Sequence, residues 1–437
     1  MKIALINHGC AKNLIDSELM AGMLADAGHR VTLDETKADV VLINTCSFIH
    51  DAEEESVQSI VKMINEGKKV IVAGCLPQKH KKELEKALPE VKAFLGTSDI
   101  NKIVEIADKI ARDEQIYDVS TNPLYHYPEE AERQQITVGS YSYLKIAEGC
   151  DCECGYCIIP KLRGKAVSRP IENIVAEAEK LTKKGVTEII LIAQDTTAYG
   201  KDLYGKPSLA KLLTELVKIK DLGRIRIMYT YPTGITDELL EVIKNNEKIF
   251  KYIDIPLQHS SPAILKAMKR PANDYRKLIK KIRKAVPEIA LRTTFIVGYP
   301  NETKEDFEHL KKFVADIKFD RLGVFEYSLE KGTYSYTLPN RVPARVKHSR
   351  KNQIMKLQQK ISKELNEKLI GKTIECIAEY ITDDGLITAR TFKDAPEIDG
   401  VIYLKTRNDD IDVVPGDIVK AIVTGADNYD LFGEIIA

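Results

Sequence analysis

The sequence has no long hydrophobic run, no excess of either charge and no N-terminal signal pattern. None of its apolar stretches approaches the roughly 18 residues that a membrane-spanning helix needs, which excludes membrane proteins of that class. The opening stretch Met1–Asn7 is too short for the hydrophobic part of a secretory signal, so we expect a cytoplasmic protein with no membrane partner. Lys plus Arg and Asp plus Glu number 65 each, and this net charge of zero indicates no partner by itself.

Cysteines are few, but half of the eight lie within the eight residues from Cys150 to Cys157. Cys150, Cys154 and Cys157 have the spacing C-x3-C-x2-C. Cytosolic thiols stay reduced, which favours metal binding or chemistry over disulfides. Three thiolates on one short loop are suited to an iron–sulfur cluster or to zinc. The loop follows the apolar run Tyr143–Ala147, so we expect it at the carboxyl end of a strand, where α/β proteins place their active sites.

Three more cysteines each end an apolar run near the N-terminus: Lys2–Cys10, Ala38–Cys46 and Lys69–Cys75. Helical spacing follows, as in Leu14–Ala27 and Ala52–Asn65. Continuous apolar runs alternating with helices predict a parallel sheet covered on both faces. Neighbouring strands lie about 4.8 Å apart, so ligands at their carboxyl ends can converge on one cluster. The alternative, three separate buried apolar cysteines, is weaker for residues at one topological position.

A chain of 437 residues is expected to form two or three domains. We predict an α/β domain over residues 1–116 and a proline-containing linker over 117–135. Residues 136–366 contain six βα-type units, fewer than the eight of a closed barrel. Residues 369–437 contain five short strands and predict a small OB-like β-barrel. The six strands of the central domain are expected at Tyr143–Ala147, Glu188–Ala193, Arg224–Met228, Tyr252–Ile255, Ala290–Val297 and Arg321–Glu326.

Charge is unevenly distributed along the chain. Residues 369–437 hold six Lys and Arg against 14 Asp and Glu, a net charge of −8, so the remainder carries +8. Arg341–Lys368 is basic, with apolar residues at helical spacing, and predicts a docked amphipathic helix with a solvated basic face rather than a nucleic-acid stripe. We expect the short basic loop Lys161–Lys165 to be solvated. Cys376 is expected to be a small core residue.

The C-x3-C-x2-C motif, with Tyr156 before its last cysteine, resembles the radical S-adenosylmethionine (SAM) enzymes. Three upstream cysteines, in Gly9-Cys10, Asn44-Thr45-Cys46 and Gly74-Cys75, look like those of the methylthiotransferases within that group. The resemblance covers nearly the whole chain. It implies a radical SAM core with a partial barrel, and a C-terminal TRAM domain that binds substrate.

The resemblance further implies two 4Fe–4S clusters, and SAM as a second kind of cofactor. Cys150, Cys154 and Cys157, called here the core cysteines, would hold the cluster that binds and cleaves SAM. Cys10, Cys46 and Cys75, called the N-terminal cysteines, would hold the cluster that carries or delivers sulfur. All six are therefore expected to be metal ligands and to carry the catalysis.

Four more residues are expected to touch cofactor. By resemblance Tyr156, Gln194 and Asp195 are candidates for holding SAM. Gly298 follows a predicted strand and can let the backbone approach a ligand closely. The simpler interpretation is that Gly298 and Pro300 only shape a turn, and that His259, at the end of another predicted strand, only caps or fills space.

The family's subgroups act on different substrates. One adds a methylthio group to the β-carbon of an aspartate in a small-subunit ribosomal protein, and another acts on an adenosine in transfer RNA. Ala395–Gly400 looks like the ribosomal-protein subgroup, and an acidic terminal domain is expected to attract a basic protein and repel RNA. Charge reversal at Asp409, Asp410 and Asp412 is then expected to weaken substrate binding. A sulfur donor and an electron donor are the other implied partners.

Two hypotheses from other classes remain open at the level of sequence. Cys152 could complete a four-thiolate zinc site with the core cysteines, in a zinc-stabilised nucleic-acid-binding protein. A structural iron–sulfur protein without turnover is the second. A zinc site of this kind leaves both the six-unit α/β domain and the N-terminal cysteines without an explanation.

Overall fold

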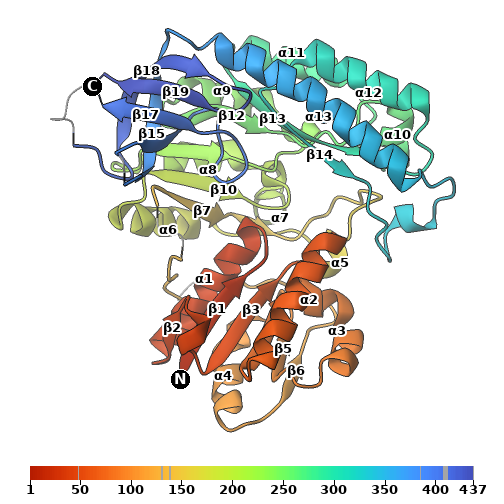
Figure 1. Ribbon diagram of the computed structural model, residues 1–437, viewed down its shortest axis with the longest axis vertical. Helices are drawn as coiled ribbons and strands as arrows, with labels where there is room; N and C mark the ends of the chain where they lie inside the picture. The colour runs from red at the N-terminus through yellow and green to blue at the C-terminus, as the bar shows by residue number, and fades with distance from the viewer. Residues whose placement is uncertain (48, 129–130, 137–138, 384, 407–411, 437) are drawn as a thin grey trace.

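The computed structural model describes residues 1–437 except 48, 129–130, 137–138, 384, 407–411 and 437. Figure 1 shows the N-terminal domain as one body and the central domain and C-terminal barrel packed together above it. In the described part of the chain, no helix is both long enough and apolar enough to cross a membrane.

The N-terminal domain is built on a six-stranded parallel sheet in the order β2-β1-β3-β4-β5-β6. Helices α1 and α4 pack on one face and α2 and α3 on the other, so the sheet is covered on both faces as predicted. The elements are β1 (Lys2–Asn7), α1 (Ala11–Asp26), β2 (Arg30–Thr32), β3 (Val40–Thr45), α2 (His50–Asn65), β4 (Lys69–Gly74), α3 (Cys75–Ala87), β5 (Ala93–Leu95), α4 (Ile103–Ala111) and β6 (Ile116–Asp118).

The central domain contains a second parallel sheet, in the order β14-β13-β12-β11-β10-β7. Its strands confirm the six predicted units, and β7 and β14 form the two edges of an open, partial barrel. The strands are β7 (Tyr141–Lys145), β10 (Glu188–Ile192), β11 (Arg224–Ile227), β12 (Ile249–Asp254), β13 (Ala290–Val297) and β14 (Arg321–Glu326). A two-stranded pair, β8 (Ala147–Glu148) and β9 (Val167–Ser168), flanks the cysteine loop.

Helices cover the outside of the partial barrel and bury its largest apolar cluster. The last of them, α13 (Ala344–Glu367), confirms the predicted docked helix, because Ile354 and Ile361 are buried against the barrel. The preceding helices are α5 (Ile159–Arg163), α6 (Ile171–Lys183), α7 (Lys201–Tyr204), α8 (Leu209–Leu216), α9 (Asp237–Asn245), α10 (Pro262–Ala267), α11 (Tyr275–Ala285) and α12 (Lys304–Ile317).

The C-terminal domain is a closed five-stranded barrel in the order β15-β16-β17-β19-β18, which confirms the predicted small β-barrel. Cys376 lies in its apolar core, as expected. The strands are β15 (Thr373–Ile381), β16 (Ile387–Thr391), β17 (Ile402–Thr406), β18 (Ile418–Ala426) and β19 (Leu431–Ile435).

Buried ion pairs fix this barrel to the central domain. Glu188 at the start of β10 accepts from Arg226 at 2.6 Å and from Arg390 of the barrel at 2.7 Å, and all three side chains are almost fully buried. Arg321 pairs with Asp394 of the barrel in the same way. The segment Ala395–Gly400 belongs to this interface, because its Asp399 carboxylate accepts from the Tyr252 hydroxyl at 2.8 Å. The barrel is therefore rigidly docked.

Candidate functional site

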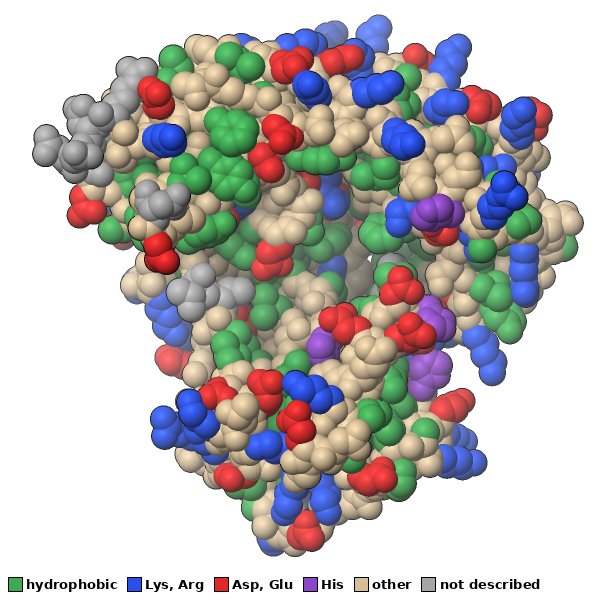
Figure 2. Space-filling model, in the orientation of Figure 1, with side chains coloured by type: hydrophobic (Ala, Val, Ile, Leu, Met, Phe, Trp, Pro, Cys, Tyr) green, Lys and Arg blue, Asp and Glu red, His purple; other side chains and the backbone are tan. Residues whose placement is uncertain are grey.

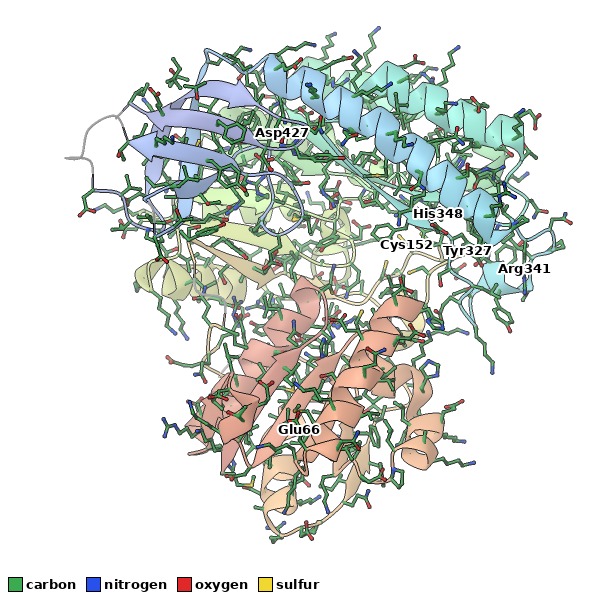
Figure 3. The ribbon with its side chains drawn as sticks, viewed as in Figure 1. Glu66, Cys152, Tyr327, Arg341, His348 and Asp427 are labelled. Carbon is green, nitrogen blue, oxygen red and sulfur yellow. The ribbon has the colours of Figure 1, made fainter. Side chains whose placement is uncertain are left out.

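The carboxyl ends of both parallel sheets face a cleft between the N-terminal and central domains. Figure 2 shows the hollow between the two bodies, and Figure 3 shows Cys152 and Tyr327 on the side of the central domain that faces it. Ile49 from the N-terminal domain lines this cleft together with Ile158, Thr294 and Phe325 of the central domain. At its edge, Lys79 pairs with Glu330 across the domains at 2.5 Å. Residues at the two sets of strand ends thus meet in one place.

The N-terminal cysteines lie at the ends of three neighbouring strands, as predicted. Cys10 precedes α1, Cys46 follows β3, and Cys75 is the first residue of α3 after β4. Cys10 is exposed to the cleft, while Cys75 is 6% exposed. Gly74 is required here because its φ is +98° and a Cβ would lie 2.7 Å from the carbonyl oxygen of Thr45.

Asn13 links two of these cysteines. Its Oδ1 lies 3.5 Å from the Cys10 sulfur and its Nδ2 lies 4.0 Å from the Cys75 sulfur. The same Nδ2 donates to Asn44 Oδ1 at 3.2 Å, and Asn44 in turn donates to the Asn13 carbonyl at 2.8 Å. Because Asn44 lies on β3 and Asn13 on α1, this network ties the start of α1, beside Cys10, to the end of β3.

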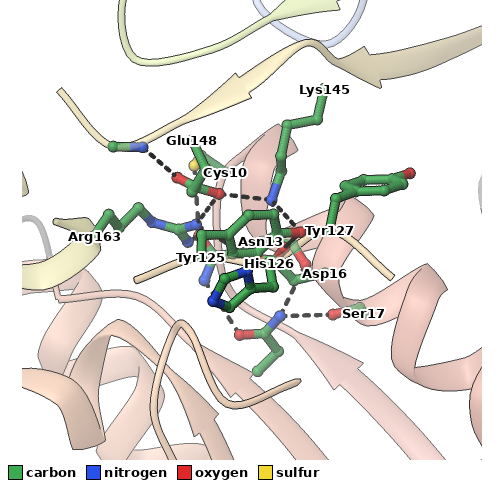
Figure 4. Close-up of polar contacts among 12 residues, drawn as sticks. Cys10, Asn13, Asp16, Ser17, Tyr125, His126, Tyr127, Lys145, Glu148 and Arg163 are labelled. Carbon is green, nitrogen blue, oxygen red and sulfur yellow. Dashed lines mark hydrogen bonds and ion pairs between the residues drawn. The ribbon is translucent and has the colours of Figure 1, made fainter. Parts of the chain in front are cut away.

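Arg163 of the central domain reaches across the cleft to Asn13 and to the polar network around it (Figure 4). Its guanidinium donates to the Cys75 sulfur at 3.6 Å and to Asn13 Oδ1 at 2.9 Å. It also pairs with Asp16 of α1 at 3.1 Å and with Glu148 at 2.8 Å. Burial raises the pKa of the Cys75 thiol, and the Arg163 charge opposes that rise. A charged arginine is thereby fixed beside the N-terminal cysteines.

The expectation that Lys161–Lys165 is a solvated loop is wrong for its central residue. Lys161 and Lys165 are exposed, but Arg163 is only 3% exposed. Its charge is balanced inside the protein, because Lys145 and Arg163 face the two carboxylates of Asp16 and Glu148. Burial acts to raise the pKa of Glu148, but the two positive charges outweigh it and hold that pKa at about 2.

The core cysteines lie on the loop between β8 and α5. The loop is held at several points, with Gly155 N–H donating to the Met268 carbonyl at 2.8 Å and Cys157 N–H to the Cys154 carbonyl at 2.9 Å. A second buried arginine, Arg270, donates to the Cys154 sulfur at 3.6 Å. Each set of cysteines therefore has one arginine that donates to a sulfur from a distant part of the chain.

The three residues expected to hold SAM lie on the side of the central domain that carries the core cysteines. The Tyr156 hydroxyl accepts from Arg270 at 3.3 Å. Gln194 donates to Glu148, which also binds Arg163. Asp195 lines a pocket with Cys150 and Cys152 and accepts from the backbone N–H of Thr197 at 2.9 Å. Burial raises the pKa of Asp195.

Gly298 directly follows strand β13 of the central domain. It has a φ of +75°, its N–H donates to Glu302, and a Cβ in its place would lie 2.3 Å from Lys347 of α13. His259 is fully buried, its Nδ1 accepts from Ser261 N–H at 3.0 Å, and burial lowers its pKa to about 3. His259 therefore acts as a buried, neutral side chain that fills space in the core.

The donor chemistry of both sets of cysteines fits iron–sulfur clusters. Each set offers three soft thiol ligands, and an arginine that donates to a sulfur is one of the means by which proteins adjust such clusters. Within the ranges that the structure describes, no three His, Cys, Asp or Glu side chains converge as ligands of a single metal ion. Thiolates of a four-iron cluster need more separation, because each binds a different iron atom.

Cys152 is predicted to be dispensable for iron binding. Its backbone N–H donates to the Cys150 sulfur at 3.4 Å, a contact that does not depend on the side chain at position 152. The Cys152 thiol also hydrogen-bonds to Cys150, and a serine hydroxyl can replace that donor. Cys152→Ser should therefore keep the full iron content and the full rate of SAM cleavage, measured by iron analysis and by release of 5′-deoxyadenosine. Loss of one cluster in this variant, or one tightly bound zinc in the wild type, would restore the four-thiolate zinc hypothesis.

Sequence reasoning missed the partners of the cysteines. Asn13, Arg163 and Arg270 carry no recognisable motif, and each binds a cysteine that is distant in the sequence or in a different element. The one available signal was the basic loop that contains Arg163, which directly follows the core cysteines. Lys12, two residues after Cys10, was also missed; its ammonium lies 3.3 Å from the ring centroid of Tyr229 across the cleft.

Comparisons with known proteins agree with this architecture. Residues 2–96 match the Uncharacterized protein family UPF0004, residues 144–314 match the Radical SAM superfamily, and residues 370–436 match the TRAM domain. Among solved structures, the radical SAM methyltransferase TsrM from Kitasatospora setae superimposes with a TM-score of 0.55, at 14% identity over 74% of this chain and 72% of that one. That likeness concerns the fold alone.

The fold and the cysteine loop define a radical SAM enzyme. Two curated relatives are similar over the full chain, both named ribosomal protein uS12 methylthiotransferase RimO. The one from Prochlorococcus marinus (strain AS9601) is 47% identical and the one from Synechococcus sp. (strain CC9902) 45%, covering 100% of this chain and 96% and 94% of theirs. The chain belongs to the RimO family of methylthiotransferases, and its cofactors are SAM and 4Fe–4S clusters.

Proposed function

We propose that this protein adds a methylthio group to the β-carbon of an aspartate in ribosomal protein uS12, in the cytoplasm. The observation that carries the proposal is the full-length similarity, at 45–47% identity, to relatives named for that activity. The presence of both sets of cysteines at the edges of one cleft supports it, because the reaction needs hydrogen removal and sulfur transfer at the same carbon.

The two sets of cysteines have separate roles in this proposal. The core cysteines hold the cluster that binds SAM, and the N-terminal cysteines hold the second cluster. The bound cofactors supply the radical, the sulfur and the methyl group. The protein positions these groups: Arg270 and Arg163 donate to one sulfur of each set, and Tyr156, Gln194 and Asp195 surround the place for SAM.

Charge supports a basic protein as the substrate. The acidic barrel, at −8, repels the phosphates of RNA and attracts a ribosomal protein rich in Lys and Arg, and this raises the rate of association. The basic face of α13 and the +8 on the other domains favour the alternative, methylthiolation of adenosine in transfer RNA. A sulfur donor and an electron donor complete the set of partners.

Mass spectrometry distinguishes the two substrates. Reconstituted enzyme, SAM and a reductant are incubated with uS12 and transfer RNA together, and we expect a methylthio group on one aspartate of uS12 only. Charge reversal at exposed Asp412 should weaken uS12 binding, more strongly at low salt; Asp409 and Asp410 lie outside the described residues. Methylthio-adenosine in transfer RNA beside unmodified uS12 would reverse the choice of substrate.

A further inference from the structure

Lys12 places a positive charge in the cleft, two residues from Cys10. It lies in the first turn of α1, and its ammonium lies against the face of the Tyr229 ring, 3.3 Å from the centroid. Tyr229 follows strand β11 of the central domain, so the pair spans the cleft. Lys12 as a whole residue is only 9% exposed to solvent.

The charge of Lys12 has no carboxylate partner in the described part of the chain. Its ammonium makes no ion pair or hydrogen bond there; it contacts the Tyr229 ring, and its charge acts on the Cys10 thiol two residues away. Lys145, a buried lysine nearby, instead pairs with both Asp16 and Glu148. Removing a cation from water without a counter-ion is unfavourable, and a ring face recovers only part of that cost. Such a site is suited to an anion that arrives with the substrate.

Tyr229 is held in a strained conformation that keeps its ring in this position. Its φ is +57°, which a bulky residue rarely adopts. The backbone N–H of Tyr229 donates to Asp254 Oδ2 at 3.0 Å. The Arg292 guanidinium in turn donates to Asp254 Oδ1 at 3.0 Å and holds this carboxylate in place. Strain of this kind persists where the surroundings enforce it, and it is concentrated at functional sites. The ring is thus fixed against Lys12 by the central domain.

We propose that Lys12 binds the side-chain carboxylate of the substrate aspartate. This inference rests on the proposed function and names the group that recognises its substrate. The γ-carboxylate is bonded directly to the β-carbon, so holding the carboxylate on Lys12 also places the reacting carbon. Cys10, two residues away, is exposed, so an incoming side chain can reach this position. An adenosine offers no carboxylate to such a cation.

The test compares two substrates on three enzymes. Binding of uS12 with its target aspartate, and of uS12 with asparagine in that place, is measured by titration calorimetry on reconstituted enzyme. Wild type should prefer the aspartate form. Lys12→Met, which keeps the length of the side chain and removes the charge, should bind the aspartate form about 30-fold more weakly and the asparagine form unchanged. Lys12→Arg should retain part of the preference.

Lys165→Met is the matched control, because it removes one exposed positive charge near the core cysteines. It should leave the preference for aspartate as in wild type. Lys12→Gln replaces Lys12→Met if the latter does not fold. Lys12 variants that still prefer the aspartate form would overturn the proposal. An equal loss of affinity for both substrates would also overturn it, and would mean that Lys12 balances the charge of the cysteines instead. A wild-type enzyme that modifies no aspartate in the mass spectra would instead overturn the proposed function.

Discussion

Alanine at any one core cysteine is expected to abolish reductive cleavage of SAM, whereas alanine at an N-terminal cysteine should leave cleavage intact and block sulfur transfer. The two sets lie on different domains, at the ends of different sheets, so a change in one set leaves the backbone of the other in place. The measurements are release of 5′-deoxyadenosine and methylthiolation of uS12, made on the same preparations. Anaerobically reconstituted wild type should bind about eight irons, and each variant about half as many.

Cys376→Ala is the control for loss of a thiol elsewhere, because that cysteine is buried in the C-terminal barrel. It should keep the iron content and both activities. The assignment of SAM cleavage to one set and sulfur transfer to the other would be wrong if all six single variants behaved alike in both assays. Loss of SAM cleavage in the N-terminal variants alone would exchange the roles of the two sets.

Replacing Arg163 with methionine is expected to destabilise the protein by about 3–5 kcal/mol, because Lys145 alone would then balance the two buried carboxylates of Asp16 and Glu148. Iron bound by the N-terminal cysteines should also be lost faster to a chelator, since the donor to the Cys75 sulfur is removed. Thermal unfolding and iron release measure the two effects. Arg163→Lys keeps the charge but not the forked geometry, and should recover stability more than iron retention.

Arg133→Met separates these two effects. Arg133 is also buried and also joins the two domains, pairing with Glu18 of α1 at 2.7 Å and with Glu177 at 2.8 Å, but it contacts no cysteine. Its loss should lower the unfolding temperature without changing iron release. Equal iron release from Arg163→Met and Arg133→Met would mean that Arg163 acts only by joining the domains.

The positions of the six cysteines could be predicted because local patterns determine them. A continuous apolar run gives a buried parallel strand, and a cysteine directly after it must lie at the carboxyl edge. The same argument located the six strands of the central domain. The order β1-β3-β4 makes the N-terminal cysteines neighbours. The pairing of β3 with β4 follows the usual adjacency of consecutive strands, whereas β1 pairs with β3 because β2 lies at the edge of the sheet.

The partners of these cysteines could not be predicted, because they depend on how whole domains pack. Arg163 and Cys75 are 88 residues apart, and Lys12 meets Tyr229 only across the cleft. A short basic loop on its own is more often solvated than buried, and nothing in the sequence of Lys161–Lys165 shows that Asp16 and Glu148 lie beneath its central residue. Long-range electrostatic pairing is the part of this site that required a structure.

The docking of the C-terminal barrel has a geometric consequence for the choice of substrate. Glu188 is held by arginines from both domains, and Arg321 adds a second buried pair, so the barrel keeps a fixed position relative to the cleft. A protein that contacts the barrel and places one residue between the two sets of cysteines must span a set distance. Under the proposed function the substrate would then be selected by its reach as well as by its charge: a segment of the right chemistry on too short a loop would be excluded.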